Sequence, residues 1–333
     1  MSGILDGKVA IVTGSGQGVG RGIAILLARE GARIITNNRS PRTRSPEESS
    51  FHASALRGTP RFNDGEAATY TVMAGDARSV AKEIIAAGGE AVPYFGDVST
   101  AEGAAGLAAA AMESYGRVDI LVNNAAGLGF GPFLSLSEED WHHQLGAKLN
   151  GAFHCMKAVV PHMVEQGHGR ILNTASDAWV GIAALSAYGA ANAGLVALTK
   201  STAKELAHHG ITVNAFCPQA ASPGHVAFGA TLRAMMEASG RSLPVDDARM
   251  RESEEAHGPA ENLTFLAYLA SDEAAGISGA VFSVTGSGQV ALYSDPRHVS
   301  EIRTSGEPWT MEELRTAVPD VLLKDWVRAT GEF

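Results

Sequence analysis

The sequence predicts a doubly wound α/β fold, with one domain built on a seven-stranded parallel sheet. Short apolar runs such as Lys8–Thr13 (KVAIVT) and Val118–Asn123 (VDILVN) alternate along the chain with segments of helical periodicity. These runs are apolar at successive positions, which is typical of parallel strands that helices cover on both faces. A glycine-rich turn, Thr13–Gly20, joins the first run to the first helical segment. The regular alternation of strand and helix therefore predicts a parallel sheet with helices on both sides.

The expected elements follow one another in a regular order. The seven strands are expected at Lys8–Thr13, Ala32–Asn37, Ala91–Phe95, Val118–Asn123, Ile171–Thr174, Ile211–Phe216 and Ala280–Val284. The helices are expected at Val19–Glu30, Arg78–Ala87, Ala101–Tyr115, from a cap at Ser137 to about Glu165 with interruptions, Tyr188–His209 and Glu261–Ala270. Ser137 precedes Asp140 by three residues, the spacing of a capping box.

Three segments depart from this alternation. A polar stretch over residues 39–76 is inserted after the second strand, and residues 218–258 form an irregular region after the sixth, with a helix expected at Val226–Ser239. Its position suits a lid over a site at the carboxyl edge of the sheet. We expect residues 1–285 to form the domain and residues 286–333 an extension that packs on it or on a partner subunit. Thr310 and Glu313 predict a capped helix at Met311–Ala317.

Composition limits the classes of function. No apolar run reaches the roughly 20 residues of a membrane span, and the N-terminus lacks a signal-peptide pattern, so we expect a cytoplasmic protein without membrane contact. A net charge of −10 argues against a nucleic-acid partner. Cys155 and Cys217 are isolated and are expected to be structural thiols. The histidines do not pair with acidic clusters at ligand spacing, so no metal site is expected.

The glycine-rich turn has the sequence context of a dinucleotide-binding loop, since it follows a strand and opens a helix. Glycines let the backbone approach a pyrophosphate, and the helix N-terminus offers unpaired N–H groups. The residues expected to contact the cofactor here are Gly14, Ser15, Gln17, Gly18, Val19 and Gly20. A purely structural tight turn is the alternative.

The end of the second strand favours NADP(H) over NAD(H). A carboxylate there would bind a free ribose 2′-hydroxyl, but this chain has Asn38 and Arg39, with Arg42 and Arg44 close behind. An arginine can bind a 2′-phosphate, although these arginines could equally form a solvated loop face. Further cofactor contacts are expected from residues after the third, fourth and sixth strands: Asp97, Val98, Asn123, Ala125, Pro218 and Gln219.

A hydroxyl and a phenol follow the fifth strand. Ser176 lies just past the strand, and Tyr188 lies in the first turn of the next helix. This pair, at the carboxyl edge of a parallel sheet, suits proton transfer to or from a substrate oxygen. One helical turn after the tyrosine stands Asn192, which is neutral and cannot favour the phenolate as a cation would. Lys148, two residues before Asn150 on another helix, is an alternative source of that charge.

The motifs TGSGQGVG, LVNNAAG, GRILNTAS and SAYGAANAG, in this order, resemble those of the short-chain dehydrogenase/reductase family, which has a Rossmann-like fold. The resemblance covers about residues 6–285, and the long insertion and C-terminal extension are closer to its hydroxyacyl-CoA and hydroxysteroid branch. It implies Tyr188 as the catalytic acid/base, Ser176 as the group that orients the substrate, and Asn150 as the holder of a relay water. Asn192 stands where the family has a lysine that also binds the nicotinamide ribose. Further departures are an extra alanine in NNAAG, a spacing between Ser176 and Tyr188 one residue shorter than in many members, and Gln219 in place of glycine after Pro218.

Three functions remain open on this evidence. The first is an oxidoreductase that interconverts a carbonyl and a secondary alcohol on a hydrophobic small molecule, with reduction favoured because a phenol of unlowered pKa stays a proton donor. The second is a non-redox acid/base enzyme, such as a dehydratase, isomerase or cyclase, with Tyr188 as the acid. The third is an inactive subunit that binds cofactor. The resemblance also implies a homodimer or homotetramer.

Overall fold

The computed structural model describes residues 3–41, 75–127, 129, 131–220, 222, 257–296, 298–303 and 308–324. The expected lid helix at Val226–Ser239, most of the 39–76 insertion, and Arg42 and Arg44 lie outside the described residues. The chain separates into two compact units, Met1–Leu292 and Tyr293–Phe333.

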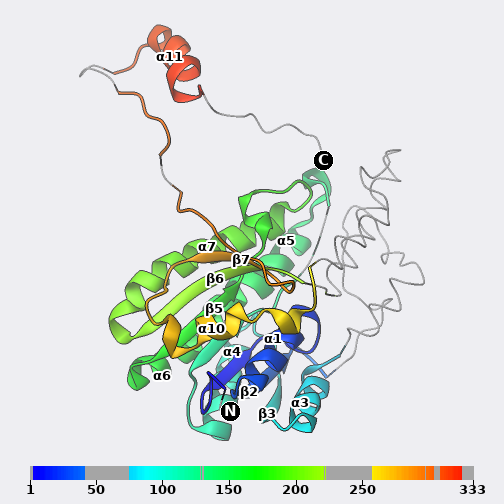
Figure 1. Ribbon diagram of the computed structural model, residues 1–333. Coiled ribbons are helices and arrows are strands. Elements are labelled where there is room, and N and C mark those ends of the chain that lie inside the picture. Colours follow the sequence, from blue (N-terminus) through cyan, green and yellow to red (C-terminus); the bar gives the residue numbers. More distant parts are fainter. Residues whose placement is uncertain are drawn as a thin grey trace. The chain divides into compact units, whose positions relative to one another are not determined.

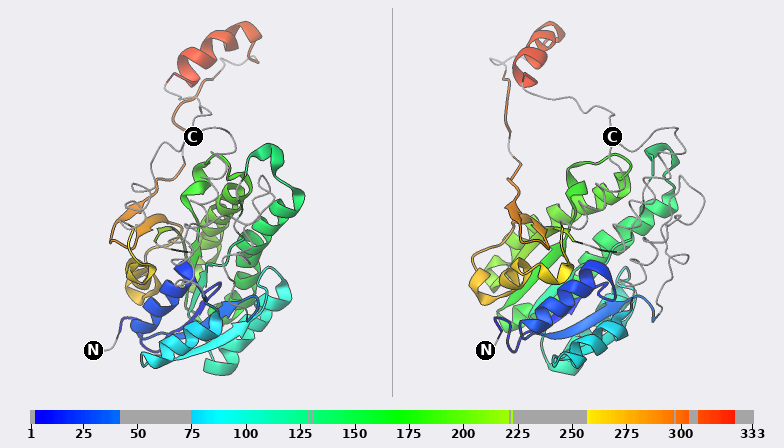
Figure 2. Two further views of the ribbon diagram at one scale, coloured as in Figure 1. Left: turned by 90° about the vertical axis from the view of Figure 1, so that its right-hand side faces the viewer. Right: turned by 45° about the vertical axis from the view of Figure 1, so that its right-hand side comes forward.

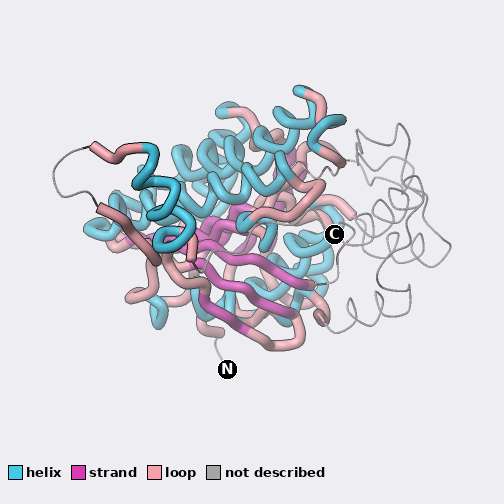
Figure 3. The backbone as a smooth tube through the Cα atoms, turned by 90° about the horizontal axis from the view of Figure 1, so that it is seen from above, coloured by secondary structure: helices cyan, strands magenta, loops and turns pink. Residues whose placement is uncertain are grey.

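The first unit is organised around one eight-stranded sheet in the order β3-β2-β1-β4-β5-β6-β7-β8. Its strands are β1 (Val9–Val12), β2 (Arg33–Asn38), β3 (Ala91–Phe95), β4 (Ile120–Asn123), β5 (Gly169–Thr174), β6 (Ile211–Gln219), β7 (Val281–Thr285) and β8 (Val290–Leu292). The strands from β1 to β7 pair in parallel, which confirms the predicted doubly wound α/β fold. Figure 3 shows the strands as a continuous twisted layer between helices.

The eighth strand was not predicted. β8 pairs antiparallel with β7 through a tight hairpin in which Gly288 has a φ of +98° and the Gln289 N–H bonds to Thr285 Oγ1. It has three residues and all are exposed, so it lacks the buried apolar pattern by which the other strands were recognised.

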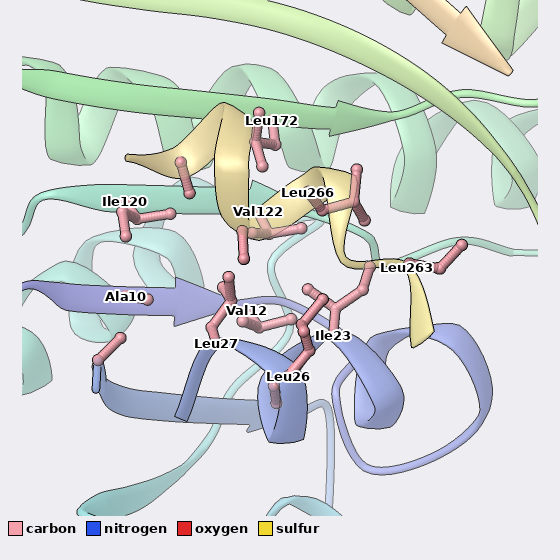
Figure 4. Packing of buried hydrophobic residues seen from close by; sticks show 14 of the residues in the cluster. Ala10, Val12, Ile23, Leu26, Leu27, Ile120, Val122, Leu172, Leu263 and Leu266 are labelled. Carbon is pink, nitrogen blue, oxygen red and sulfur yellow. The ribbon is translucent and has the colours of Figure 1, made fainter. Parts of the chain in front are cut away.

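Helices cover both faces of the sheet (Figures 1 and 2). Three of them, α1 (Gly18–Arg29), α3 (Ala77–Ala86) and α10 (Phe265–Ala270), bury apolar residues against one face. Figure 4 shows this packing, with Ile23 and Leu26 of α1 and Leu266 of α10 over Val12 and Val122 of the central strands. The other face is covered by α4 (Ala101–Tyr115), α6 (Gly151–Gln166) and α7 (Ser186–Leu206).

The helix expected from Ser137 to about Glu165 consists of three parts. Ser137 caps α5 (Glu138–Leu145), with its Oγ accepting a hydrogen bond from the Asp140 N–H at 3.1 Å. A π-helical turn, η3 (Gly146–Asn150), then leads into α6. A π turn inside an α-helix inserts an extra residue into the winding, and such turns are frequent at functional sites.

Other boundaries differ by a few residues. β6 continues to Gln219 because its last residues pair with β7, including Pro218 with Val284. The helix expected at Glu261–Ala270 is instead a 3₁₀ turn, Ala260–Asn262, followed by α10.

The second unit contains the predicted helix α11 (Met311–Ala317). Both bonds of its capping box are present: the Glu313 N–H donates to Thr310 Oγ1 and the Thr310 N–H donates to the Glu313 carboxylate. Among the helices of the described residues, none is long and apolar enough to cross a membrane.

Candidate active site

The predicted functional residues gather at one edge of the sheet, because parallel strands all end on the same side. The loops after β1 and β4 diverge at this edge, since β1 is followed by strands on one side and β4 by strands on the other. A topological switch point of this kind opens a crevice in which ligands of α/β proteins bind.

The loop after β1 is shaped by glycine conformation and close packing. Gly14 and Gly18 have φ values of +62° and +53°, in the left-handed region that side chains disfavour. A Cβ on Gly20 would lie 2.5 Å from the Gly14 carbonyl oxygen, so only glycine fits there. Ser15 is fully buried and its Oγ accepts the Asn37 N–H at 2.9 Å, which ties the loop to β2.

The start of α1 presents unpaired donors. Gln17 is its N-cap residue, and its side chain makes no capping hydrogen bond. The first N–H groups of a helix have no intrahelical partner, so those of Gly18, Val19 and Gly20 can bind an anion. No acidic residue lies in this first turn, so none repels an anion there.

The ends of β2 and β3 lie side by side. The Gly96 N–H donates to the Asn38 carbonyl oxygen at 3.0 Å, and Arg39 Nη1 lies 3.9 Å from Asp97 Oδ2. Both side chains of this pair are well exposed, so the pair contributes little stability. The neighbouring Val98 is buried.

Asn37 was not predicted as a functional residue, although it organises this corner. Its side chain accepts the Gly14 N–H at 3.3 Å and donates to the Gly96 carbonyl at 3.1 Å. In the sequence, Asn37 is the last residue of a predicted buried strand. Because a buried amide needs hydrogen-bond partners, this position could have indicated its structural role.

The segment after β4 is held against the glycine loop. Thr13 Oγ1 accepts the backbone N–H groups of Asn124 and Ala125 at 2.9 and 3.0 Å. Asn123 Nδ2 donates to Asn173 Oδ1 at 2.8 Å, and Asn173 Nδ2 donates to Thr199 Oγ1 at 2.9 Å. This buried chain links β4, β5 and α7, and so fixes α7 relative to the cofactor loop.

Ser176, Tyr188 and Asn192 come together beyond the end of β5. Burial raises the pKa of the Tyr188 phenol, while hydrogen bonding to the side chains of Ser176 and Asn192 acts to lower it and Cys217 acts to raise it. Ser176 is the cap of a 3₁₀ turn, Asp177–Val180, and its Oγ accepts the Ala178 N–H at 3.3 Å. A phenol beside a hydroxyl in this position can exchange a proton with a substrate oxygen.

Asn192 is fully buried on α7. Its Nδ2 donates to the Tyr188 carbonyl oxygen at 2.8 Å, whereas its Oδ1 is buried and finds no partner among the described residues. A buried acceptor without a donor is costly in a protein interior. A ribose hydroxyl is a donor of the right kind for this oxygen.

The expected role of Asn150 in a proton relay stays a prediction. Asn150 is exposed, whereas Lys148, two residues earlier, is buried with 2% of its surface exposed. The reason is helical periodicity: Lys148 precedes the buried Ala152 by four residues and Cys155 by seven, and so lies on the inner face. This spacing explains why Lys148, which the sequence offered as an alternative source of positive charge, lies inside the protein.

Pro218 and Gln219 lie at the end of β6, on the same edge of the sheet. Gln219 Nε2 donates to Asp177 Oδ2 at 2.7 Å, which connects β6 to the turn after Ser176. The neighbouring Cys217 is a buried free thiol.

The arrangement fits a nicotinamide dinucleotide. The unpaired N–H groups at the start of α1 suit its pyrophosphate. The buried Oδ1 atoms of Asn38, Asn123 and Asn192 have no hydrogen-bond partner among the described residues, so they are free to accept hydrogen bonds from ribose hydroxyls. Among the described residues, no group of three or more histidine, cysteine or acidic side chains could hold a metal ion.

The sequence matches known proteins over most of its length. A profile described as short chain dehydrogenase matches residues 63–227. The chain is 30% identical over 286 residues to the (2S)-[(R)-hydroxy(phenyl)methyl]succinyl-CoA dehydrogenase subunit BbsD of Thauera aromatica, with 85% of this chain and 96% of that protein covered. It is 32% identical over 284 residues to the 3-oxoacyl-[acyl-carrier-protein] reductase of Synechocystis sp., with 85% and 97% covered.

A solved structure agrees with these relatives. The crystal structure of a short chain dehydrogenase from Mycobacterium avium is 31% identical, with 99% of this chain and 98% of that chain covered and a TM-score of 0.72. Relatives at this identity and coverage share the fold. The chain therefore belongs to the short-chain dehydrogenase/reductase family and is a short-chain oxidoreductase, and membership of this family implies an NAD(P) cofactor.

Proposed function

We propose that this protein is an NADP(H)-dependent oxidoreductase that interconverts a carbonyl and a secondary alcohol on a hydrophobic small molecule, with reduction favoured. The observation that carries the proposal is the position of the Tyr188 phenol, between the side chains of Ser176 and Asn192. All three lie at the sheet edge that also bears the glycine loop.

The chemistry assigns a role to each of these side chains. When bound, NADPH supplies a hydride to the carbonyl carbon. Tyr188 donates its phenolic proton to the carbonyl oxygen, and the Ser176 hydroxyl orients that oxygen. Burial raises the pKa of the phenol, so Tyr188 is protonated at neutral pH and ready to act as an acid. This favours reduction over oxidation, which needs the phenolate.

The preference for NADP(H) rests on the end of β2. Asn38 is neutral, and Arg39 is 51% exposed and, among the described residues, forms a loose ion pair with Asp97. A weakly paired, exposed arginine can turn to form charge-assisted bonds with a 2′-phosphate. The glycine loop would hold the pyrophosphate, and Asn192 Oδ1 would accept a hydroxyl of the nicotinamide ribose.

An apolar rim supports a hydrophobic substrate. Val180 and Ile182, in the segment between Ser176 and Tyr188, are 62% and 46% exposed, and Leu134 is 99% exposed. The Gly131 N–H donates to the Ala184 carbonyl at 3.0 Å, so the segments that carry these side chains lie together. Exposed apolar groups beside a polar reaction centre are typical of a site for a small apolar molecule.

We also infer a cytoplasmic homodimer or homotetramer. Cys155 and Cys217 are buried free thiols, as expected in a reducing compartment. The oligomeric state is inferred from what is usual in the family. Light scattering would measure it.

The proposal is tested by following NADPH absorbance with a panel of apolar ketones and with NADH in parallel. The expected result is consumption of NADPH that depends on the ketone, is slower with NADH, and falls by about 10²- to 10⁴-fold in Tyr188→Phe. Tight NADPH binding without turnover would instead indicate an inactive subunit, and conversion of substrate without a change in NADPH would indicate a non-redox acid/base enzyme.

A further inference from the structure

The end of the 39–76 insertion returns to the glycine loop. A Cβ on Gly16 would lie 2.6 Å from the Cα of Asp76 and would also meet Oδ1 of Asn38. A Cβ on Gly75 would lie 2.6 Å from the carbonyl oxygen of Gly16. The glycine loop, the last residue of β2 and Asp76 therefore meet at one point, and only glycine fits at position 16.

Hydrogen bonds from two elements hold this corner in place. Thr36 Oγ1 donates to the Ala77 carbonyl oxygen at 2.8 Å, which ties the first turn of α3 to β2. Arg21 of α1 donates twice to the carboxylate of Glu83 on α3, at 2.6 and 3.2 Å. The position of Asp76 beside the glycine loop is thus fixed from both β2 and α1.

Asp76 brings a carboxylate to this corner. It is the N-cap residue of α3: its Oδ1 accepts the Ser79 N–H at 2.9 Å, and its own N–H donates to Ser79 Oγ at 2.9 Å. An aspartate side chain is short, and this capping box fixes it, so the carboxylate stays at the start of α3.

The charge of Asp76 is not paired with a cation in the part of the chain that the structure describes. The two arginines nearest to it in sequence have other partners there. Arg39 lies 3.9 Å from Asp97, and the Arg78 guanidinium lies over the ring of Phe95, 5.3 Å from its centroid. Asp76 therefore keeps a negative charge that its described neighbours do not neutralise.

This corner is where the two nicotinamide dinucleotides differ. The end of the second strand faces the adenosine ribose in folds of this type, and NAD(H) carries a 2′-hydroxyl there whereas NADP(H) carries a 2′-phosphate. Asn38 Oδ1, which is buried and finds no partner among the described residues, and the Asp76 carboxylate are both acceptors. Acceptors suit a hydroxyl, which can donate a hydrogen bond, whereas a carboxylate repels a phosphate.

We propose that Asp76 is a specificity-determining residue of the cofactor site, which accepts a hydrogen bond from the 2′-hydroxyl of NAD(H) and opposes the binding of a 2′-phosphate. Asp76 thus acts against Arg39 and narrows the preference of the protein for NADP(H). Its charge also offsets the positive end of the α3 dipole, which would otherwise attract a phosphate. The inference rests on the proposed function in that Arg39 sets the preference that Asp76 reduces.

The test is the affinity of the full chain for NADPH and for NADH, measured by cofactor fluorescence at low ionic strength. Asp76→Asn removes the charge, and asparagine caps a helix as well as aspartate does. The Kd for NADPH should fall by about tenfold, the effect of one unit charge roughly 6 Å away at an effective dielectric constant of about 40. The Kd for NADH should rise by about threefold, because a hydrogen bond to a neutral amide is weaker than one to a carboxylate.

Two further variants separate charge from shape and from position. Asp76→Ser is neutral, smaller and also a good N-cap, so it should give the same fall in the Kd for NADPH. Glu205→Gln removes an exposed acid in the last turn of α7, at the opposite edge of the sheet, and should change neither Kd. In about 1 M salt, where the Debye length is about 3 Å, the gain in NADPH affinity of both Asp76 variants should largely disappear.

The ratio of the two Kd values decides on Asp76. A ratio that stays at its wild-type value in both neutral variants would overturn the role of Asp76, whether the two constants change together or not at all. A wild-type protein that binds NADH more tightly than NADPH would instead overturn the NADP(H) preference of the proposed function. The ratio in the variants would still decide on Asp76 in that case.

Discussion

Replacing Lys148 by methionine should stabilise the folded protein at neutral pH. The pKa of the buried amine falls from 10.5 to about 8, and each pH unit corresponds to about 1.4 kcal/mol, so the buried charge costs about 3 kcal/mol of folding free energy. This cost is fully present below pH 8, where both states are protonated. It is relieved between pH 8 and 10.5, because there the unfolded chain binds a proton that the folded protein does not. Methionine has a similar length, fills the same space and carries no charge.

Urea unfolding at fixed protein concentration measures this difference. The free energy of unfolding of Lys148→Met should exceed that of the wild type by about 3 kcal/mol at pH 7 and by about 1.5 kcal/mol at pH 9.5. Lys157→Met, at an exposed position on α6, should change it by less than about 0.5 kcal/mol at either pH. A destabilised Lys148→Met, or a gain that does not shrink as pH rises, would refute the view that Lys148 is a buried and unpaired cation.

Three further predictions concern the cofactor site and its support. Arg39→Gln should raise the Kd for NADPH by about tenfold and leave that for NADH unchanged in a fluorescence titration; equal effects on both would refute a 2′-phosphate contact. In Gly20→Ala the new Cβ would lie 2.5 Å from a carbonyl oxygen of the same loop, so affinity for both cofactors should fall together, and unchanged affinity would exclude this loop as the binding element. Asn173→Ala leaves the buried polar groups of Asn123 and Thr199 without their hydrogen-bond partner and should lower the free energy of unfolding by about 2–4 kcal/mol. A loss below about 0.5 kcal/mol in urea unfolding would contradict a stabilising role of Asn173.

The centre of the sheet could be predicted from the sequence because β1, β4 and β5 are buried on both faces. Ala91–Phe95 and Ala101–Tyr115 have the bounds that their apolar patterns predicted. The sequence could not reveal β8, since Val290–Leu292 is held by backbone pairing to β7 and buries none of its side chains. Element ends also depend on tertiary pairing, as the extension of β6 to Gln219 illustrates.

The candidate site was less predictable than the fold. The glycine loop and the Ser176–Tyr188 pair are local in sequence, so motif spacing suffices to identify them. Asn150 was chosen by its residue type within a motif, whereas the helix turns Lys148 inward. Contacts between distant segments, such as that of Asn37 with Gly96, follow only from strand order and register.

Transfer of deuterium tests the central claim most directly. NADPH labelled at the reactive hydrogen of C4 is incubated with the wild-type protein and a ketone that it consumes, and the alcohol is analysed by mass spectrometry and NMR. We predict one deuterium per molecule at the carbinol carbon, with the hydroxyl proton taken from solvent by way of Tyr188, and a strongly reduced yield in Tyr188→Phe. An unlabelled product, or equal labelling rates in the two proteins, would contradict a hydride transfer assisted by Tyr188.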